Sequence, residues 1–131
     1  MKLLVDTQVW LWTLVDDVRL GPDARRLLAA RKNEPLLSAA SAWEIAIKFR
    51  LGKLVLPADP EAFVPSRLLR DGIGSLPVDV RHALRVASLP GLHRDPFDRL
   101  LVAQAQVEDL PILTADPLIG RYDVTVIPAS R

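Results

Sequence analysis

Five acidic side chains fall where short apolar runs end or where a helix is expected to begin: Asp6, Glu44, Asp95, Asp98 and Asp116. The ligand site of an open parallel sheet lies beyond the carboxyl ends of its strands, so acids at these ends would meet although they are far apart in sequence. Carboxylates that lie close together repel one another unless a cation neutralises them. Mg²⁺ prefers such oxygen ligands. The pattern therefore indicates a candidate site for Mg²⁺ or Mn²⁺, ions that activate water and clamp phosphate oxygens.

Some of these acids also have an ordinary structural explanation. Asp95, followed by Pro96, has the pattern of a helix start, and Asp98 would then lie near the favourable end of the helix dipole. Asp116, followed by Pro117, is a typical turn opener. For each of these acids taken alone, both explanations stay open.

Glu44 and Asp6 differ in how well a structural role accounts for them. Ser41 and Glu44 have the spacing of a capping box, and Glu44 can also pair with Lys48 four residues later. Asp6 directly ends an apolar strand, where a buried carboxylate without a partner is costly. Separate structural roles do not explain why all of these acids fall where one site would form.

The elements that must position the acids follow from the apolar runs. Short runs without polar alternation predict strands that are buried on both faces, at 3–6, 35–38, 111–114 and 124–127. A turn and a short strand are expected at 72–77. Helices are expected between them, at 7–15, 24–32, 41–51, 60–69, 79–88 and 97–107. Strands that alternate with helices predict an α/β fold. We expect one three-layer α/β/α domain over residues 1–131, with a short, mostly parallel central sheet.

Composition excludes several other kinds of protein. The 131 residues correspond to one domain, with an ordinary globular balance of 50% hydrophobic and 25% charged residues. Cysteine is absent, which excludes disulfides and thiolate metal sites, and two histidines are too few for a histidine-rich zinc site. No apolar stretch is long enough to span a bilayer and no signal-peptide pattern is evident, so we expect a cytoplasmic protein. The net charge is +1, but with four acids neutralised, 17 basic side chains face 12 acidic ones, which mildly favours a polyanionic ligand.

Four blocks of the sequence resemble the PIN-domain ribonucleases and, within them, the VapC-type toxins of bacterial toxin–antitoxin pairs. The blocks stand in the family's order, as LLVDT at 3–7, SAASAWEIAIK at 38–48, HRDPFDRLLVAQA at 93–105 and LTAD at 113–116. The resemblance covers essentially the whole chain. It implies a PIN-like fold and Mg²⁺- or Mn²⁺-dependent endonucleolytic cleavage of single-stranded or looped RNA that leaves a 5′-phosphate. It also implies a small antitoxin as protein partner, and we expect a twofold homodimer, the commonest symmetric assembly.

The resemblance assigns the family's four acids to Asp6, Glu44, Asp98 and Asp116, which we expect to be catalytic. Asp6, Asp98 and Asp116 are the predicted metal ligands, and Glu44 would complete the acidic ring directly or through water. Which acid activates the water stays open. Asp95 either joins the site or caps its helix.

The neighbours of these acids provide supporting predictions. Thr7 and Thr114 match hydroxyl positions that are expected to orient carboxylates or bind water. Gln8 departs from the branch, which often has histidine there, so a substrate or supporting contact at that position is in doubt. Candidate phosphate contacts flank the acidic blocks at Lys48, Arg94 and Arg99.

Aromatic and apolar side chains could serve either the core or a partner. Trp10, Trp12 and Trp43 could stack bases, although core or interface packing is the simpler interpretation. The apolar faces of the first two helices are candidates for an antitoxin groove and a dimer contact, through Trp10, Trp12, Leu14, Leu27 and Leu28.

Other functional classes make distinct predictions. A catalytically silent PIN-like module that binds RNA or protein would have no reason to keep four mutually repelling acids. An aspartyl-nucleophile phosphatase needs a second acid two residues after Asp6, where this chain has Gln8. A mechanism based on two imidazoles would need His82 and His93 in one site, and nothing in the sequence places them together. His82 is expected to be structural or exposed.

Overall fold

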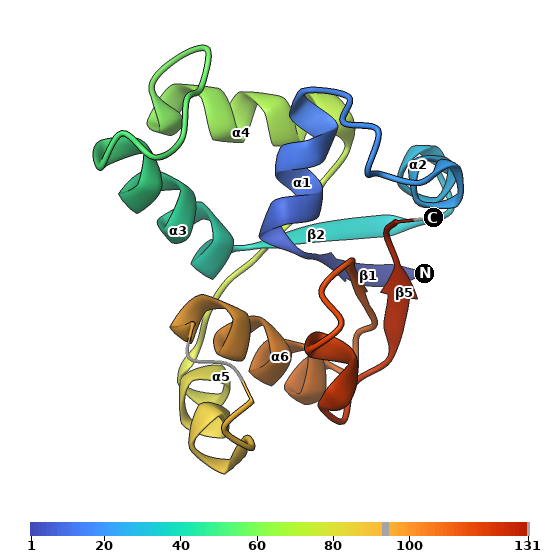
Figure 1. Cartoon of the computed structure of the whole chain (residues 1–131), viewed down its shortest axis with the longest axis vertical. Coiled ribbons are helices and arrows are strands. Elements are labelled where there is room, and N and C mark those ends of the chain that lie inside the picture. Colours follow the sequence, from blue (N-terminus) through green and yellow to red (C-terminus); the bar gives the residue numbers. More distant parts are fainter. Residues whose placement is uncertain (93–94, 131) are drawn as a thin grey trace.

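The computed structural model describes residues 1–92 and 95–130, and these form a single parallel sheet of five strands with helices around it (Figure 1). The strands are β1 (Lys2–Val5), β2 (Glu34–Ser38), β3 (Gly74–Leu76), β4 (Ile112–Thr114) and β5 (Val126–Pro128). Their order across the sheet is β3-β2-β1-β4-β5, and every neighbouring pair is parallel. The predicted α/β class is confirmed, and the sheet is wholly rather than mostly parallel.

The helices cover both faces of the sheet, as the uninterrupted apolar strands require. They are α1 (Thr7–Leu14), α2 (Pro22–Ala29), α3 (Ala39–Arg50), α4 (Pro60–Asp71), α5 (Val80–Arg85) and α6 (Pro96–Glu108), with short 3₁₀ turns at Val86–Ser88 and Ile119–Arg121. Figure 1 shows α1, α3 and α4 on one side of the sheet and α5 and α6 on the other.

Side chains of the central strand β1 divide between two apolar cores, because successive residues of a strand point to opposite faces. Leu3 and Val5 belong to one buried cluster, which includes Trp10 of α1 and Ile45 of α3. Leu4 belongs to the other, which is built mainly from α6 and its neighbours. The predicted α/β/α layering is thus visible in the packing.

The helices that follow β1 and β2 begin directly at the carboxyl edge of the sheet. Asp6 caps α1 by accepting a hydrogen bond from the backbone N–H of Gln8, and Ser38 caps α3 by accepting from Ala40. The predicted start of this third helix at Ser41 is wrong, because the Ser38 hydroxyl at the strand end already satisfies a free N–H of the first turn. The alternative capping box of Ser41 and Glu44 is therefore also wrong.

Several segments differ from their predicted bounds, among them the second helix, which was expected at 24–32 and covers Pro22–Ala29. The last strand begins at Val126 rather than at Val124, because Val126 pairs with Ile112, the first residue of β4. The turn and short strand predicted over 72–77 are confirmed: Gly72 ends α4 with a left-handed φ of 70°, and the strand covers Gly74–Leu76. Within the described part of the chain, no helix has the length and apolar character needed to cross a bilayer.

Candidate metal-binding active site

Five carboxylates from separate parts of the chain line one open cavity of about 340 Å³, here called the acidic pocket. They are Asp6, Glu44, Asp95, Asp98 and Asp116. The pocket lies at the carboxyl edge of the sheet beside β1 and β4, where the chain order reverses from one side of β1 to the other. The structure thus brings together all four predicted catalytic acids, and the alternative ligand Asp95 with them.

Asp6 is buried at the end of the central strand, with 6% of its surface exposed, the same fraction as Glu44. Its Oδ2 accepts a hydrogen bond of 2.7 Å from the Thr114 hydroxyl, and its Oδ1 accepts a longer one of 3.4 Å from the backbone N–H of Gln8. Burial raises the pKa of this carboxyl, these hydrogen bonds lower it in part, and the charges of Asp116 and Glu44 raise it further. Asp6 is thus a carboxylate whose charge the apo protein does not fully compensate.

Thr114 links the two acids at the ends of adjacent strands. While its hydroxyl donates to Asp6, its oxygen accepts from the backbone N–H of Asp116 at 3.0 Å. The Asp116 carboxylate in turn accepts from the N–H of Leu118 at 2.9 Å, so Asp116 also opens a turn. The position of Thr114 agrees with the prediction that it orients a carboxylate. Thr7 differs: its hydroxyl donates to Ser41 at 2.7 Å and fastens α1 to α3 instead.

Glu44 lies against Lys48 one helical turn away. The Lys48 Nζ donates to Glu44 Oε2 at 2.7 Å, and the Glu44 side chain is buried whereas that of Lys48 is 47% exposed. The hydrogen bond to Glu44 raises the pKa of Lys48, and the charges of Asp95 and Asp98 raise it further. Lys48 therefore supplies a positive charge inside an otherwise negative pocket.

Asp95 and Asp98 enter the pocket from the first turn of α6. The Asp95 carboxylate caps this helix by accepting from the N–H groups of Phe97, at 2.8 Å, and Asp98, at 3.4 Å. The capping role predicted for Asp95 is confirmed, although the residue also lines the pocket. The cap fixes the first turn and thereby the position of Asp98.

The other predicted phosphate contacts have different outcomes. The Arg99 guanidinium donates to the carbonyl oxygens of Val86, Leu89 and Pro90, and Arg99 does not line the acidic pocket. A substrate contact by Arg99 is thus not supported, because its donors hold the segment before α6. Arg94 and His93 lie outside the described residues.

The apolar faces of the first two helices belong mainly to the core. Trp10 is fully buried and Trp12 is 8% exposed, while Leu27 and Leu28 pack against the same cluster. The predicted partner surface is therefore wrong for Trp10, whereas Leu27 and Leu28 are only partly buried and their contact with a partner stays a prediction. Trp12 and Leu14 instead border an apolar groove, a cavity of about 570 Å³ that adjoins the acidic pocket and shares Lys48 with it.

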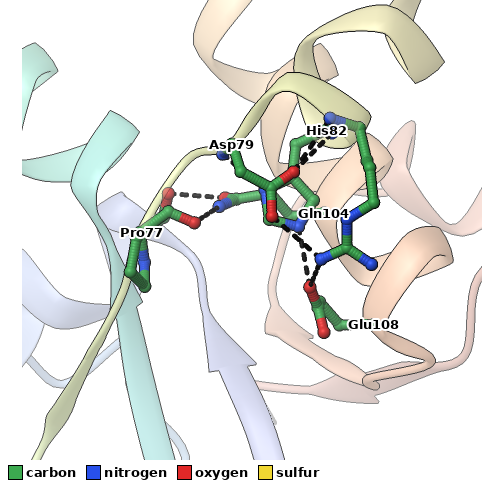
Figure 2. Close-up of polar contacts among 7 residues, drawn as sticks. Pro77, Asp79, His82, Gln104 and Glu108 are labelled. Carbon is green, nitrogen blue, oxygen red and sulfur yellow. Dashed lines mark hydrogen bonds and ion pairs between the residues drawn. The ribbon is translucent and has the colours of Figure 1, made fainter.

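Sequence reasoning missed the buried amide of Gln104 in α6. Its oxygen accepts a hydrogen bond from the Ser38 hydroxyl at 2.5 Å. Its nitrogen donates to the carbonyl oxygen of Pro77 at 3.1 Å, a contact that Figure 2 shows. Because Ser38 also caps α3, one side chain connects α6 with the start of the helix that contains Glu44. A polar residue inside the apolar run 100–105 was the available signal.

A second group of possible metal ligands lies away from the pocket. Asp79, His82 and Glu108 bring one ligand atom each within 4.8 Å of one another, and the carboxylates of the acidic pocket form no such triplet among the described residues. His82 Nδ1 accepts from the N–H of Asp79, so its Nε2 bears the proton and faces Glu108 at 2.9 Å (Figure 2). The Arg81 guanidinium binds both carboxylates, at 2.8 and 3.0 Å. This group is a structural link between α5 and α6, as predicted for His82, because a guanidinium already serves as its cation.

The acidic pocket offers the donor set of a hard divalent ion. All five acidic ligand candidates are carboxylates, and the cavity of about 340 Å³ is large enough for a hydrated ion. Carboxylate oxygens are the protein ligands that Mg²⁺ prefers, and the ion usually keeps several of its waters. The residues present therefore fit a hydrated Mg²⁺ or Mn²⁺.

The fold and the pocket define an α/β protein whose candidate site is an all-oxygen acidic cluster at the carboxyl ends of parallel strands. The chain belongs to the PIN domain family, whose model matches residues 3–124.

Known proteins resemble the chain in sequence and in fold. Ribonuclease VapC16 of Mycobacterium tuberculosis is 48% identical over 68 residues, which span 49% of this chain and 48% of that protein. The match thus covers about half of the length of this relative. VapBC2 from Rickettsia felis, solved bound to a DNA fragment from its promoter, superposes with a TM-score of 0.72 at 15% identity over 97% of this chain and 98% of that one. FitAcB from Neisseria gonorrhoeae has a TM-score of 0.61 at 23% identity over 98% of both chains. These structures share the fold.

Proposed function

We propose that the chain is a Mg²⁺- or Mn²⁺-dependent endoribonuclease and the toxin of a toxin–antitoxin pair. The observation that supports this most directly is the convergence of Asp6, Glu44, Asp98 and Asp116 in one pocket. Separate structural roles do not explain a costly buried acid at the sheet edge among three further carboxylates. Membership in the PIN family and the local similarity to Ribonuclease VapC16 support the choice of RNA as substrate.

In this proposal, Asp6, Asp98 and Asp116 hold the metal, and Glu44 contacts it directly or through water. The bound ion would lower the pKa of a water and neutralise charge on the phosphate. The chain's own residues keep the carboxylates in place: Thr114 fixes Asp6, and the Asp95 cap fixes the turn that contains Asp98.

Lys48 has two roles in the proposed reaction. Its ammonium compensates Glu44 in the apo protein at 2.7 Å, and it is exposed enough to meet a phosphate oxygen when substrate enters. An ammonium near the transferred phosphate stabilises the negative charge that develops there.

A catalytically silent module that binds RNA or protein is the alternative. It predicts RNA binding without cleavage, and it predicts no loss of function when the acids are neutralised.

The deciding experiment is cleavage of a fluorescently labelled single-stranded RNA with Mg²⁺, with Mn²⁺ and with EDTA. Asp98→Asn should abolish turnover while the fold is kept, because asparagine is tolerated in a helix first turn. The matched control is Glu61→Gln, which neutralises an exposed acid in the first turn of α4 outside the pocket. Cleavage that survives EDTA, or that Asp98→Asn leaves unchanged, would reject the proposal.

The antitoxin partner is proposed to occupy the apolar groove beside the acidic pocket. Leu11, Trp12, Leu54 and Phe63 line this groove. A partner segment that fills the groove could place a basic side chain among the carboxylates and compete with the metal. Expression of the chain alone should arrest cell growth, and co-expression of a small protein encoded next to it should relieve this arrest. Leu54→Asp should abolish the relief without abolishing RNA cleavage.

A twofold homodimer in the cytoplasm completes the proposal. Val80 and Leu84 on α5 are 72% and 70% exposed, which leaves apolar surface for a second copy. Sedimentation equilibrium tests the dimer directly.

A further inference from the structure

Trp43 is exposed to solvent beside the acidic pocket, unlike Trp10 and Trp12, which are buried. Its exposed fraction is 63%, although tryptophan is usually kept from water. The ring packs edge to face on Phe97 of α6, with centroids 5.4 Å apart and an interplanar angle of 79°. This contact holds an apolar aromatic surface in a defined orientation at the α3–α6 contact.

The aromatic pair is adjacent to the pocket on both of its helices. Trp43 directly precedes Glu44, and Phe97 directly precedes Asp98, and both acids line the pocket. Consecutive Cα atoms are about 3.8 Å apart, so the backbone of each aromatic residue adjoins that of a residue lining the pocket. A nucleotide whose phosphate enters the pocket would bring its neighbouring base to this surface.

We propose that Trp43, supported by Phe97, is a stacking platform for an unpaired base next to the cleaved phosphate. The inference rests on the proposed ribonuclease function and specifies how that site selects its substrate. Proteins that bind single-stranded RNA stack its unpaired bases on exposed aromatic rings, and any base can serve because every base has a π-face. A base in a duplex is already stacked and paired, so the platform selects single strands and loops without reading sequence.

An RNA base is favoured over a second protein chain as the occupant because of the charges beside the ring. The neighbouring pocket has five carboxylates with Lys48 among them, which is the environment of a cation and a phosphate. A stacked base and a bound phosphate belong to one nucleotide chain. One RNA ligand therefore explains both the exposed aromatic ring and the acidic pocket that contains Lys48.

The test measures steady-state cleavage of a single-stranded 12-nucleotide RNA by the full chain in Mg²⁺. Trp43→Ala should raise KM roughly 5- to 100-fold, the usual effect of losing one base stack, with a much smaller change in kcat. Trp43→Phe should recover most of the loss. Leu69→Ala, at an 85% exposed apolar residue of α4, is the control and should change neither constant. Thermal unfolding verifies that each variant is folded.

Substrates with a single abasic nucleotide identify the stacked base. The KM of the wild-type protein should rise when the nucleotide next to the cleavage site is abasic. The KM of Trp43→Ala should be the same for the abasic and the intact substrate. If wild-type protein cleaves RNA but Trp43→Ala has an unaltered KM, the stacking role is rejected and the nuclease stands. If Trp43→Ala instead converts a dimer to a monomer, Trp43 is a contact between copies and the proposal is overturned. If wild-type protein cleaves no RNA, the proposed function fails and the stacking role fails with it.

Discussion

Asp6→Asn is predicted to stabilise the metal-free protein while it abolishes catalysis. The carboxylate is 6% exposed, and burial together with the charges of Asp116 and Glu44 outweighs its hydrogen bonds, so its pKa is raised. A raised carboxyl pKa means that the charged form is less stable in the folded chain than in the unfolded chain. Each pKa unit corresponds to about 1.36 kcal/mol. An uncharged group of the same shape removes this penalty.

The change in stability is the balance between the removed burial penalty of the Asp6 charge and the weakened hydrogen bond from Thr114. The hydrogen bond from Thr114 weakens by about 1 kcal/mol when its acceptor becomes neutral, and asparagine remains a good N-cap for α1. Because the raised pKa already includes this bond, we expect a net gain on the order of 1 kcal/mol at pH 7, or roughly 3–5 °C in Tm. The gain should fade as the pH falls through the raised pKa of the folded state and vanish below the unfolded value of 3.8, where Asp6 is protonated in both states.

The assay is thermal and urea unfolding of wild type and Asp6→Asn, in EDTA and in saturating Mg²⁺. Metal at about 100 times its Kd stabilises the wild type by about 2.7 kcal/mol, so the order of stabilities should invert. An Asp6→Asn variant that is less stable than wild type in EDTA at pH 7 would refute the assigned penalty. A difference that Mg²⁺ leaves unchanged would remove Asp6 from the metal site.

Further predictions concern residues around the pocket and at α5. Lys48→Met should destabilise the metal-free protein by about 1–2 kcal/mol, since buried Glu44 loses a charged hydrogen bond, and saturating Mg²⁺ should restore part of it in the same unfolding assay. Gln104→Leu should lower stability by about 2 kcal/mol in urea, because the polar groups that bind its amide lose their partner; an unchanged midpoint would contradict this role. The Arg81 hydrogen bond lowers the pKa of Asp79 to about 2, so Asp79 stabilises the fold above its unfolded pKa of 3.8 and loses this effect as the pH falls toward 2. Asp79→Asn should therefore flatten the dependence of the urea midpoint on pH across that window, and an unaltered slope would count against it.

The sequence predicted the site largely because strand ends are a local feature. An acid after the buried run 3–5 and another after 112–114 must meet if both strands are parallel neighbours, whatever the rest of the chain does. Asp95 followed by Pro96 specified a helix start in the same way. Local patterns therefore located both the acids and the helix that presents Asp98.

Contacts between distant residues could not be predicted in this way. The hydroxyl of Thr7 meets Ser41 across 34 residues, and Ser38 meets Gln104 across 66, and neither pair has a spacing rule. The start of α3 was misplaced because two serines could cap it, and the geometry of the strand end decided for Ser38. The solvent exposure of the tryptophans could not be predicted from the sequence either, because only tertiary packing distinguishes Trp43 from the buried Trp10.

The hydrogen bond between Asp6 and Thr114 joins residues that are 108 positions apart. Strand β1 pairs with β4 on this side, so a chain growing on the ribosome has one open edge on its central strand until residue 114 emerges. Until then Asp6 lacks its hydroxyl partner, and Asp116 lies in the part of the chain that has not yet emerged. The acids at positions 6, 44 and 98 are all present earlier, without a completed pocket around them. Such long-range pairing also forms slowly. In the proposed function, the complete acidic pocket therefore forms only after nearly all of the domain has been synthesised.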